Sequence, residues 1–385
     1  MERRLDIDAL IADPTVTTVV CCGSGGVGKT TTAAAFAIRA AEAGRKVAVL
    51  TIDPARRLAQ ALGVGDLTND PSPVKAIRGT GSLDALMLDM KRTFDDVVLQ
   101  HASGQKAQQI LDNPFYQAVS SSFAGTQEYM AMERLAQLQA EKGPDGAAAW
   151  DLIVVDTPPS RSALDFLDAP NRLSSFLDGR FIRILMAPAK AGGKVYLKVM
   201  SAGLNTIAGV LSKIVGGQLL SDVQTFVAAL DTMFGGFRER AEQTYAVLAA
   251  PSTAFLVVAT PDREALREAA YFTQRLADDH MPLAGVVVNR VQPALVAGLS
   301  GPRALAAAAV MEEQPKRPGS GWQPMDTAGL LLLHAESETV RERHEAAIAR
   351  FRAAQPELAL VEVATQATDV NDLDQLREIG AELAR

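Results

Sequence analysis

Cysteine is scarce in this chain, and this scarcity limits the metal and redox chemistry that it can perform. Its 385 residues include two cysteines, Cys21 and Cys22, which are neighbours within one apolar run. Adjacent residues of a strand point to opposite faces of a sheet, so these thiols cannot hold one metal ion together, and we expect no zinc. We expect both to be small buried residues of a cytoplasmic protein, since a reducing compartment keeps thiols free.

Long apolar runs and an excess of positive charge are also missing. No run of about 18 apolar residues occurs, so the sequence predicts no transmembrane helix. Residues 1–8 lack the apolar core of a signal peptide. The formal net charge of −7 argues against general nucleic-acid binding. Contents of 48% hydrophobic and 22% charged residues are typical of a soluble globular protein.

The chain does contain a series of short apolar segments that alternate with longer helical stretches. Such continuous apolar segments suit strands of a parallel sheet that is buried on both faces. We therefore expect an α/β fold with a doubly wound, mostly parallel sheet and a ligand at the carboxyl ends of its strands. The expected strands are residues 17–22, 46–52, 83–88, 151–155, 254–259, 284–289 and 358–363.

A glycine-rich loop follows the first expected strand and precedes an alanine-rich helical run. A Gly-x-x-x-x-Gly-Lys-Thr sequence in this setting binds phosphates, because its backbone N–H groups surround a polyphosphate at a helix N-terminus. We expect Lys29 to bind the β- and γ-phosphates and the Thr30 hydroxyl to bind Mg²⁺. The predicted nucleotide-binding residues are Gly23, Ser24, Gly25, Gly26, Val27, Gly28, Lys29, Thr30 and Thr31.

Two carboxylates follow expected strands. Asp156 ends an apolar strand, as in a Walker B site, whose Asp orients Mg²⁺ through a coordinated water. Asp53 follows strand 46–52, where it is placed to activate the attacking water and to contact the metal. The alternative for Asp53 is a turn or helix-capping residue before Pro54.

A polar pair, Asn289 and Arg290, ends strand 284–289. The Asn289 amide can both donate to and accept from a purine edge, and the alternative is that it caps the strand end. A guanine site usually adds a carboxylate shortly afterwards, as in Asn-Lys-x-Asp, and residues 289–292 lack one. The predicted ligands are therefore ATP and Mg²⁺.

The sequence also predicts how the single ATPase domain is organised. The nucleotide-binding core comprises about residues 15–90, 146–165, 250–295 and 355–385. Two intervals that predict helices without strands, about 91–145 and 166–249, form a helical subdomain. Residues 310–325 contain Gln-Pro-Lys-Arg-Pro-Gly-Ser-Gly, which predicts an exposed, mobile loop.

Four separated motifs together resemble the family of the arsenite-pump ATPase and the guided-entry targeting factor for tail-anchored proteins. The motifs are residues 23–31, Thr-Ile-Asp-Pro-Ala-Arg-Arg-Leu at 51–58, Asp-Thr-Pro-Pro-Ser-Arg-Ser-Ala-Leu at 156–164, and Val-Asn at 288–289. Residues 125–130 and 165–170 look most like its actinobacterial ArsA-like group. The resemblance implies an ATP hydrolase in which Asp53 activates water, Asp156 begins switch II and Asn289 contacts adenine. It also implies a dimer whose ATP-driven closing rearranges the helical subdomain.

One departure from the family pattern bears on the partner. The family usually has a lysine at the position of Ser24, which reaches the phosphates bound by the other subunit. A homodimer of this chain lacks that cation unless Arg56, Arg57 or Arg161 replaces it. The sequence therefore favours a heterodimer with a lysine-bearing paralogous ATPase. The family's Cys-x-x-Cys zinc clip is missing as well.

The segment 171–217 is basic, with seven Lys and Arg against one Asp, and apolar residues are interspersed with these charges. Three interpretations remain open: a groove for a hydrophobic client, a surface that contacts a membrane, or a helical core with a solvated basic face. Two functions follow. The first is an Mg-dependent ATPase that moves a hydrophobic or membrane-associated client; the alternative is a nucleotide-gated regulatory subunit with low turnover. A compact partition ATPase is disfavoured by the large helical insertions.

Overall fold

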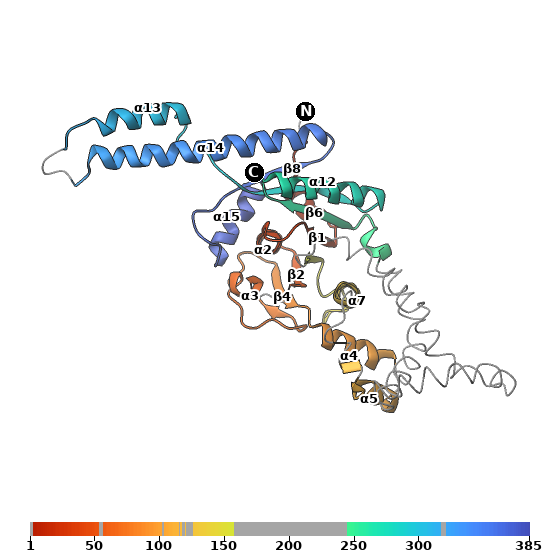
Figure 1. Cartoon of the computed structure of the whole chain (residues 1–385). Helices are drawn as coiled ribbons and strands as arrows, with labels where there is room; N and C mark the ends of the chain where they lie inside the picture. The colour runs from red at the N-terminus through yellow and green to blue at the C-terminus, as the bar shows by residue number, and fades with distance from the viewer. Residues whose placement is uncertain are drawn as a thin grey trace, which may run out of the picture.

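An eight-stranded sheet forms the centre of the protein, in the strand order β3-β4-β2-β5-β1-β6-β7-β8 (Figure 1). The computed structural model describes residues 3–53, 57–101, 104–114, 116–117, 120, 126–157, 245–316 and 321–385. The strands are β1 (Thr18–Cys22), β2 (Lys46–Thr51), β3 (Ser72–Pro73), β4 (Ser82–Met87), β5 (Leu152–Asp156), β6 (Thr253–Ala259), β7 (Leu283–Val291) and β8 (Leu360–Ala364). All seven strands expected from the sequence are present, with ends that differ by at most about two residues.

The sheet is parallel except at one edge. Strand β3 pairs antiparallel with β4, and every other neighbouring pair is parallel. Each residue of β1, β5 and β6 is buried, as expected for strands that are covered on both faces. Strand β3 was not predicted, because two residues are too few to form a recognisable pattern.

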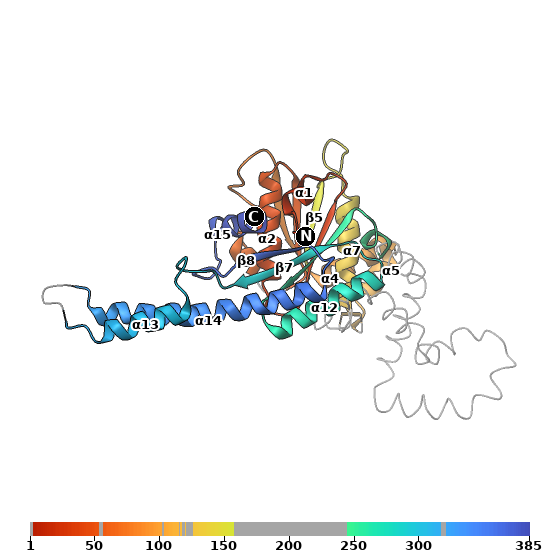
Figure 2. The same cartoon turned by 90° about the horizontal axis from the view of Figure 1, so that it is seen from above.

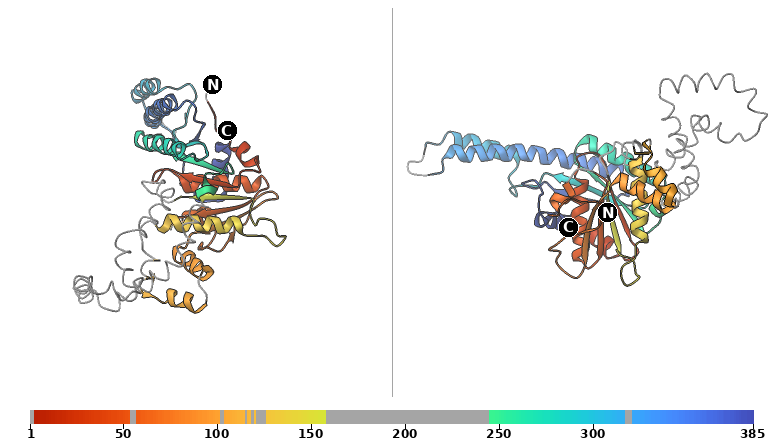
Figure 3. Two further views of the ribbon diagram at one scale, coloured as in Figure 1. Left: turned by 90° about the vertical axis from the view of Figure 1, so that its right-hand side faces the viewer. Right: turned by 90° about the horizontal axis from the view of Figure 1, so that it is seen from below.

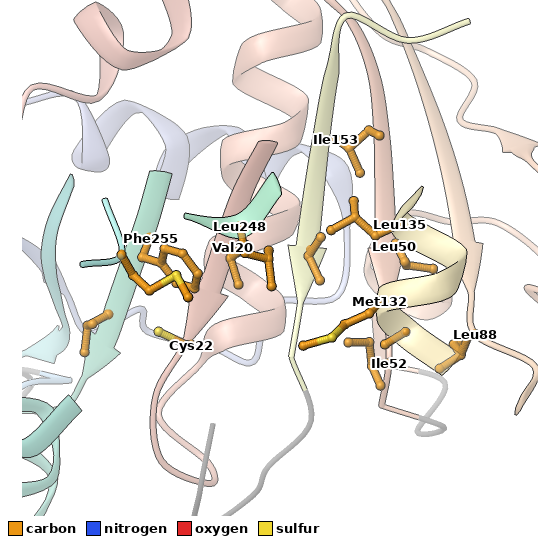
Figure 4. Packing of buried hydrophobic residues seen from close by; sticks show 14 of the residues in the cluster. Val20, Cys22, Leu50, Ile52, Leu88, Met132, Leu135, Ile153, Leu248 and Phe255 are labelled. Carbon is orange, nitrogen blue, oxygen red and sulfur yellow. The ribbon is translucent and has the colours of Figure 1, made fainter. Parts of the chain in front are cut away.

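Helices cover both faces of the sheet, so the fold is doubly wound as predicted (Figure 3). One face packs against α1 (Ile7–Ala12), α2 (Lys29–Glu42), α3 (Arg57–Ala61) and α15 (Leu373–Leu383). The other packs against α4 (Met90–His101), α7 (Thr126–Ala140), α12 (Arg263–Asp278) and the C-terminal part of α14 (Pro324–Ala354), and α5 (Gly104–Leu111) lies against α4 in the same apolar core. Figure 4 shows this second core, where Met132 and Leu135 of α7 lie over the sheet.

The two cysteines lie on opposite faces of β1, which confirms the prediction made from their adjacency. Cys21 belongs to the apolar core beneath α2, and Cys22 belongs to the core beneath α7 and α12. Both side chains are buried. Burial raises the pKa of the Cys22 thiol to about 12, and it raises the pKa of Cys21 well above its usual value.

The part of the chain expected to form the helical subdomain is described only in its first half. Residues 91–145 contain most of α4, together with α5 and α7, and α7 packs directly on the sheet. Residues 158–244, which include the basic segment 171–217 and Arg161, lie outside the described residues, as does Arg56. None of the helices in the described ranges combines the length and apolar character that a membrane span requires.

A helical hairpin between β7 and β8 was not predicted. Helix α13 (Gly301–Glu312) lies antiparallel against α14, and the pair projects from the rest of the molecule (Figures 1 and 2). The predicted loop at 310–325 therefore overlaps the end of α13 and the start of α14. Residues 304–311 and 327–335 contain no charged residue, so neither helix shows the alternation of polar and apolar faces that identifies a surface helix.

Candidate nucleotide-binding site

The glycine-rich loop runs from the end of β1 to the start of α2 and is enclosed by the ends of β6 and β7. Gly23 and Gly28 have φ values of 146° and 97°, which residues with a side chain rarely adopt. A Cβ atom at Gly23 would lie 2.1 Å from the Val258 carbonyl oxygen, and one at Gly28 would lie 2.1 Å from Asn289 Nδ2. Glycine is therefore required at position 23 by conformation and by space, and at position 28 by conformation, where any Cβ would also displace the Asn289 amide.

Lys29, the first residue of α2, is held inside this loop. Its Nζ donates hydrogen bonds to the carbonyl oxygens of Gly23 (3.0 Å) and Ser24 (2.8 Å), and the side chain is buried. Burial lowers the pKa of Lys29, while the charges of Asp156 and Asp53 oppose that shift. An ammonium group has three donors, so these two bonds leave capacity for a phosphate oxygen.

Asp156 lies at the end of β5 and is completely buried. Its Oδ2 accepts hydrogen bonds from the hydroxyls of Thr30 (2.7 Å) and Thr51 (2.9 Å). Burial raises the pKa of Asp156 to about 6, although both hydroxyls act to lower it. Its Oδ1 has no hydrogen-bond partner among the described residues. A buried acceptor is costly to leave unpaired, so this oxygen beside the Thr30 hydroxyl fits a Mg²⁺ ion with its coordinated water.

Thr51 was not singled out by the sequence, yet it links the Asp156 carboxylate to the backbone of Asp53. Its hydroxyl donates to Asp156 and accepts a hydrogen bond from the Asp53 backbone N–H at 3.3 Å. Thr51 and Asp156 are register partners on the neighbouring strands β2 and β5. Asp53 is half-buried and lies two residues after the end of β2. The strand order would have been needed to find this contact, because the two residues are far apart in sequence.

A cleft of about 800 Å³ adjoins the loop on the side of β6 and β7. Arg290 lines it and has a left-handed backbone with φ of 60°. His344 of α14 also lines it, accepting a hydrogen bond at Nδ1 from the Gln292 backbone N–H at 3.1 Å. Burial lowers the pKa of His344, which favours a neutral ring with a donor at Nε2. The other lining residues are Ser24, Gly25, Gly26, Val27, Thr260, Pro261, Asp262, Glu264, Ala265 and Glu268.

Asn289 lies beside the cleft and bonds to its own chain. Its Nδ2 donates to the Val27 carbonyl oxygen at 2.9 Å, and its Oδ1 accepts from the Arg290 backbone N–H at 3.0 Å. These bonds correspond to the alternative in which the amide caps the strand end. The contact with adenine stays a prediction. His344 was missed because nothing near it in the sequence resembles a nucleotide motif.

The structure therefore brings the predicted site residues to one edge of the sheet. Residues 23–31 and Asp53 follow β1 and β2, Asp156 is the last residue of β5, and the pair 289–290 belongs to the last three residues of β7. Parallel strands place these ends together, which explains how residues so distant in sequence converge. Of the three arginines considered as substitutes for the family lysine, Arg57 is described, and it lies exposed at the start of α3.

The sequence is similar to those of known ATPases. Residues 16–307 match the family described as anion-transporting ATPase. The chain is 25% identical over 271 residues to ATPase GET3 of Podospora anserina, covering 70% of this chain and 71% of that protein. It is 26% identical over 293 residues to ATPase GET3 of Ajellomyces dermatitidis, covering 73% and 75%. A putative arsenical pump-driving ATPase of Halobacterium salinarum is 29% identical over 173 residues, covering 44% of this chain and 26% of that protein.

Proposed function

The chain belongs to the anion-transporting ATPase family and is an ATP hydrolase, and we propose that its cycle depends on Mg²⁺ and moves a hydrophobic or membrane-associated client. The observation that carries the metal dependence is the buried, unpartnered Oδ1 of Asp156 beside Thr30 and the phosphate-binding loop. A carboxylate in this position costs stability unless a cation or its water binds there.

Each side chain of the site then has a proposed role. The loop N–H groups and Lys29 bind and orient the phosphates, and their positive charge opposes the charge that develops during transfer. Thr30 and Asp156 hold Mg²⁺, which when bound neutralises phosphate charge. Asp53 positions the attacking water, and the cleft beside Arg290 and His344 receives the base.

These roles are tested by two substitutions and a distant control. Lys29→Ala should lower kcat/KM for MgATP by at least about 100-fold, because it removes a cation from the transition state. Asp53→Asn should lower kcat at nearly unchanged ATP affinity. Glu313→Gln, exposed at the C-terminal end of α13 in the projecting hairpin, should change neither. An unchanged kcat in Asp53→Asn would show that Asp53 does not position the attacking water. Unchanged activity in Lys29→Ala would show that ATP is not hydrolysed at this site.

The working assembly that we propose is a dimer in which a lysine-bearing paralogue supplies the cation that Ser24 cannot. Ser24 is partly exposed, and Gly25 and Gly26 are exposed, so this side of the loop is accessible to a second subunit. The alternative is a regulatory subunit that binds ATP and turns over little of it.

Restoring the family lysine separates these two possibilities. Ser24→Lys should raise the ATP turnover of the isolated chain by at least about tenfold if a trans cation is missing, whereas Ser24→Ala should not. Turnover and native mass are measured together, with and without ATP. If the unmodified chain alone hydrolyses ATP at an ordinary rate and Ser24→Lys does not change that rate, the heterodimer proposal is contradicted.

The proposed client-binding element is the basic segment 171–217, supported by its charge and by the apolar residues interspersed with its Lys and Arg residues. We expect the protein to retain a soluble fusion carrying a C-terminal apolar helix of about 20 residues, and to release it on ATP hydrolysis. The same fusion without the apolar helix is the control. Equal retention of both fusions would exclude client binding of this kind.

A further inference from the structure

Strand β7 ends in an irregular turn beside the cleft. Its register with β8 shifts between Val288 and Val291, and Arg290 between them has a left-handed backbone with φ of 60°. Arg290 is exposed and lines the cleft, whereas Asn289 and Val291 on either side of it are buried. A strained residue of this kind keeps its conformation only where the surrounding contacts hold it, and bulged strands often direct a side chain towards a site. The contacts around residues 289–292 therefore determine the shape of this wall of the cleft.

Gln292 attaches this turn to α14 through both its backbone and its side chain. Its backbone N–H donates to His344 Nδ1 at 3.1 Å, and its Nε2 donates to the Ser337 hydroxyl at 2.8 Å. Ser337 and His344 are seven residues apart, about two turns of an α-helix, so both face Gln292 from the same side of α14. All three residues are partly buried. One helix thus fixes the position and the direction of the chain at Gln292.

Helix α14 is held firmly enough to serve as this support. Ile348 and Phe351, in its C-terminal part, are buried in the apolar core beneath the sheet. On the other side of the two contacts, the His334 ring is buried and bonds through Nε2 to the Leu299 carbonyl oxygen at 2.7 Å. Because the helix is anchored both before and after its contacts with Gln292, these contacts hold the turn in place.

The turn is attached to the phosphate-binding loop at its other end. Asn289 Nδ2 donates to the Val27 carbonyl oxygen at 2.9 Å, and Asn289 Oδ1 accepts from the Arg290 backbone N–H at 3.0 Å. Arg290 therefore lies between a contact with the loop and a contact with α14. The two bonds from Gln292 to α14 involve neither the loop nor Lys29, so they act on the cleft wall without changing the phosphate-binding groups.

From this arrangement we propose that Gln292 is a positioning residue for the nucleotide, because its two bonds to α14 hold Arg290 at the side of the cleft that receives the base. This role rests on the proposed function, in which the base binds in this cleft. A wall that is already in place does not have to be ordered when the ligand binds, so it increases the affinity. The phosphates bind to the loop and Lys29 instead. Loss of either bond should therefore weaken binding of a complete nucleotide and leave binding of its phosphate chain unchanged.

Binding of two ligands to the full-length protein tests this role: a non-hydrolysable MgATP analogue and magnesium tripolyphosphate, which lacks the base and the sugar. Ser337→Ala removes one hydrogen-bond partner of Gln292, and a bond of about 1 kcal/mol corresponds to about a fivefold change in affinity. We therefore expect the nucleotide to bind about fivefold more weakly and tripolyphosphate to stay within about twofold of its original affinity. Ser337→Thr retains the hydroxyl and should bind both ligands normally. Calorimetric titration measures both affinities.

Thr339→Val is the matched control on the same helix. The Thr339 hydroxyl donates to the Ala335 carbonyl oxygen at 2.9 Å, so this variant also removes a hydroxyl, but one that bonds within its own helix. It should leave the affinity for both ligands unchanged. Steady-state hydrolysis gives a second readout. Ser337→Ala should raise KM for MgATP at an unchanged kcat, because the groups around the transferred phosphate are not altered.

The backbone bond is tested separately at His344. His344→Leu removes the acceptor of the Gln292 N–H and should weaken nucleotide binding by at least about fivefold. His344→Asn supplies an amide oxygen near the position of Nδ1 and should restore the affinity to within about threefold. Thermal unfolding shows whether each variant keeps its fold, and Ser337→Ala decides the matter if His344→Leu does not fold.

Unchanged nucleotide affinity in both Ser337→Ala and His344→Leu would overturn the role of Gln292. Equal losses for the nucleotide and for tripolyphosphate would also overturn it, because α14 would then support the phosphate-binding loop and not the base. So would a Ser337→Thr variant that binds the nucleotide as weakly as Ser337→Ala. Tripolyphosphate binding that does not need Lys29 would contradict the proposed function itself. Binding that needs Lys29 but does not respond to Ser337→Ala or His344→Leu would contradict only the role of Gln292.

Discussion

At the scale of one residue, Asp156 is a carboxylate of the nucleotide site whose ionised form is disfavoured by burial when no ligand is bound. Two hydroxyls stabilise its ionised form, but burial has the larger effect and raises its pKa to about 6. The folded protein thus retains a proton on this group at pH values where the unfolded chain has already released it. A cation at the site reverses this preference by favouring the carboxylate.

The pH dependence of Asp156 has a definite sign. The pKa of Asp156 in the folded protein is about 6, above its usual value of 3.8, so between about pH 4 and 6 the folded protein binds more protons than the unfolded chain. This group therefore makes the nucleotide-free protein less stable as pH rises through that window. Asp156→Asn should abolish this loss and raise the free energy of unfolding at pH 7 by about 2–3 kcal/mol. Urea denaturation at pH 4.5 and 7 measures the effect, with exposed Glu336→Gln as control. If the unfolding free energy of Asp156→Asn changes between pH 4.5 and 7 as much as that of the unmodified protein, this role of Asp156 is contradicted.

Thr51 controls the same carboxylate from a neighbouring strand. Its hydroxyl lowers the pKa of Asp156, so Thr51→Val should raise that pKa further and shift the lower pH limit of Mg-dependent ATP binding upwards. Thr51→Ser retains the hydroxyl and should retain the profile. Calorimetric titration of MgATP between pH 5 and 8 distinguishes the two variants. Coincident profiles would show that the Thr51 hydroxyl does not tune the site.

At the scale of the element, the phosphate-binding loop depends on contacts from strands that are remote in sequence. Val258 of β6 contacts Gly23, and Asn289 of β7 contacts both Gly28 and the Val27 carbonyl. The glycine spacing predicts the loop because the backbone alone requires glycine there. It does not predict which side chains enclose the loop, because these depend on the order of the strands.

Alanine substitutions at two glycines of the loop distinguish the cost of backbone strain from the cost of a steric clash. Gly26 and Gly28 both have positive φ, but a Cβ at Gly26 meets no atom within 4 Å, whereas one at Gly28 meets the Asn289 amide. Gly26→Ala should cost about 1–2 kcal/mol of unfolding free energy from strain alone. Gly28→Ala should cost at least about 1 kcal/mol more and weaken ATP binding, since Asn289 must move. Denaturation and ATP titration of both variants test this order, and equal losses would refute the role of Asn289.

At the scale of the whole molecule, the sequence predicts the sheet well and the hairpin poorly. The seven apolar segments were recognisable because strands buried on both faces need continuous apolar residues. The α13–α14 hairpin has no recognisable sequence pattern, because residues 304–311 and 327–335 are apolar on their exposed side as well as on the side between the two helices. The predicted loop residues 23–31, Asp53 and Asp156 converge because they end parallel strands, whereas Thr51 and His344 are recruited by tertiary packing that sequence order does not reveal.

Helix α14 should contribute to stability in only one of its halves. Phe351 is buried in the core beneath the sheet, whereas Leu333 is 62% exposed on the hairpin. Phe351→Ala should lower the free energy of unfolding by about 3–5 kcal/mol through the cavity it leaves. Leu333→Ala should change it by less than about 0.5 kcal/mol at concentrations where the chain is monomeric. A large loss of unfolding free energy in Leu333→Ala would show that another part of the same chain covers Leu333.

The two cysteines of β1 provide a built-in reporter of local opening. Each thiol is buried beneath a different helical layer, and neither ionises readily at neutral pH, so an alkylating reagent reaches them only when the layer above opens. In Cys22→Ser, the labelling rate of Cys21 follows opening on the α2 side; in Cys21→Ser, Cys22 follows the α7 and α12 side. We expect ATP to slow labelling of Cys21 more strongly, because α2 begins at the phosphate loop. Equal protection of both thiols would indicate that the two layers open as one unit.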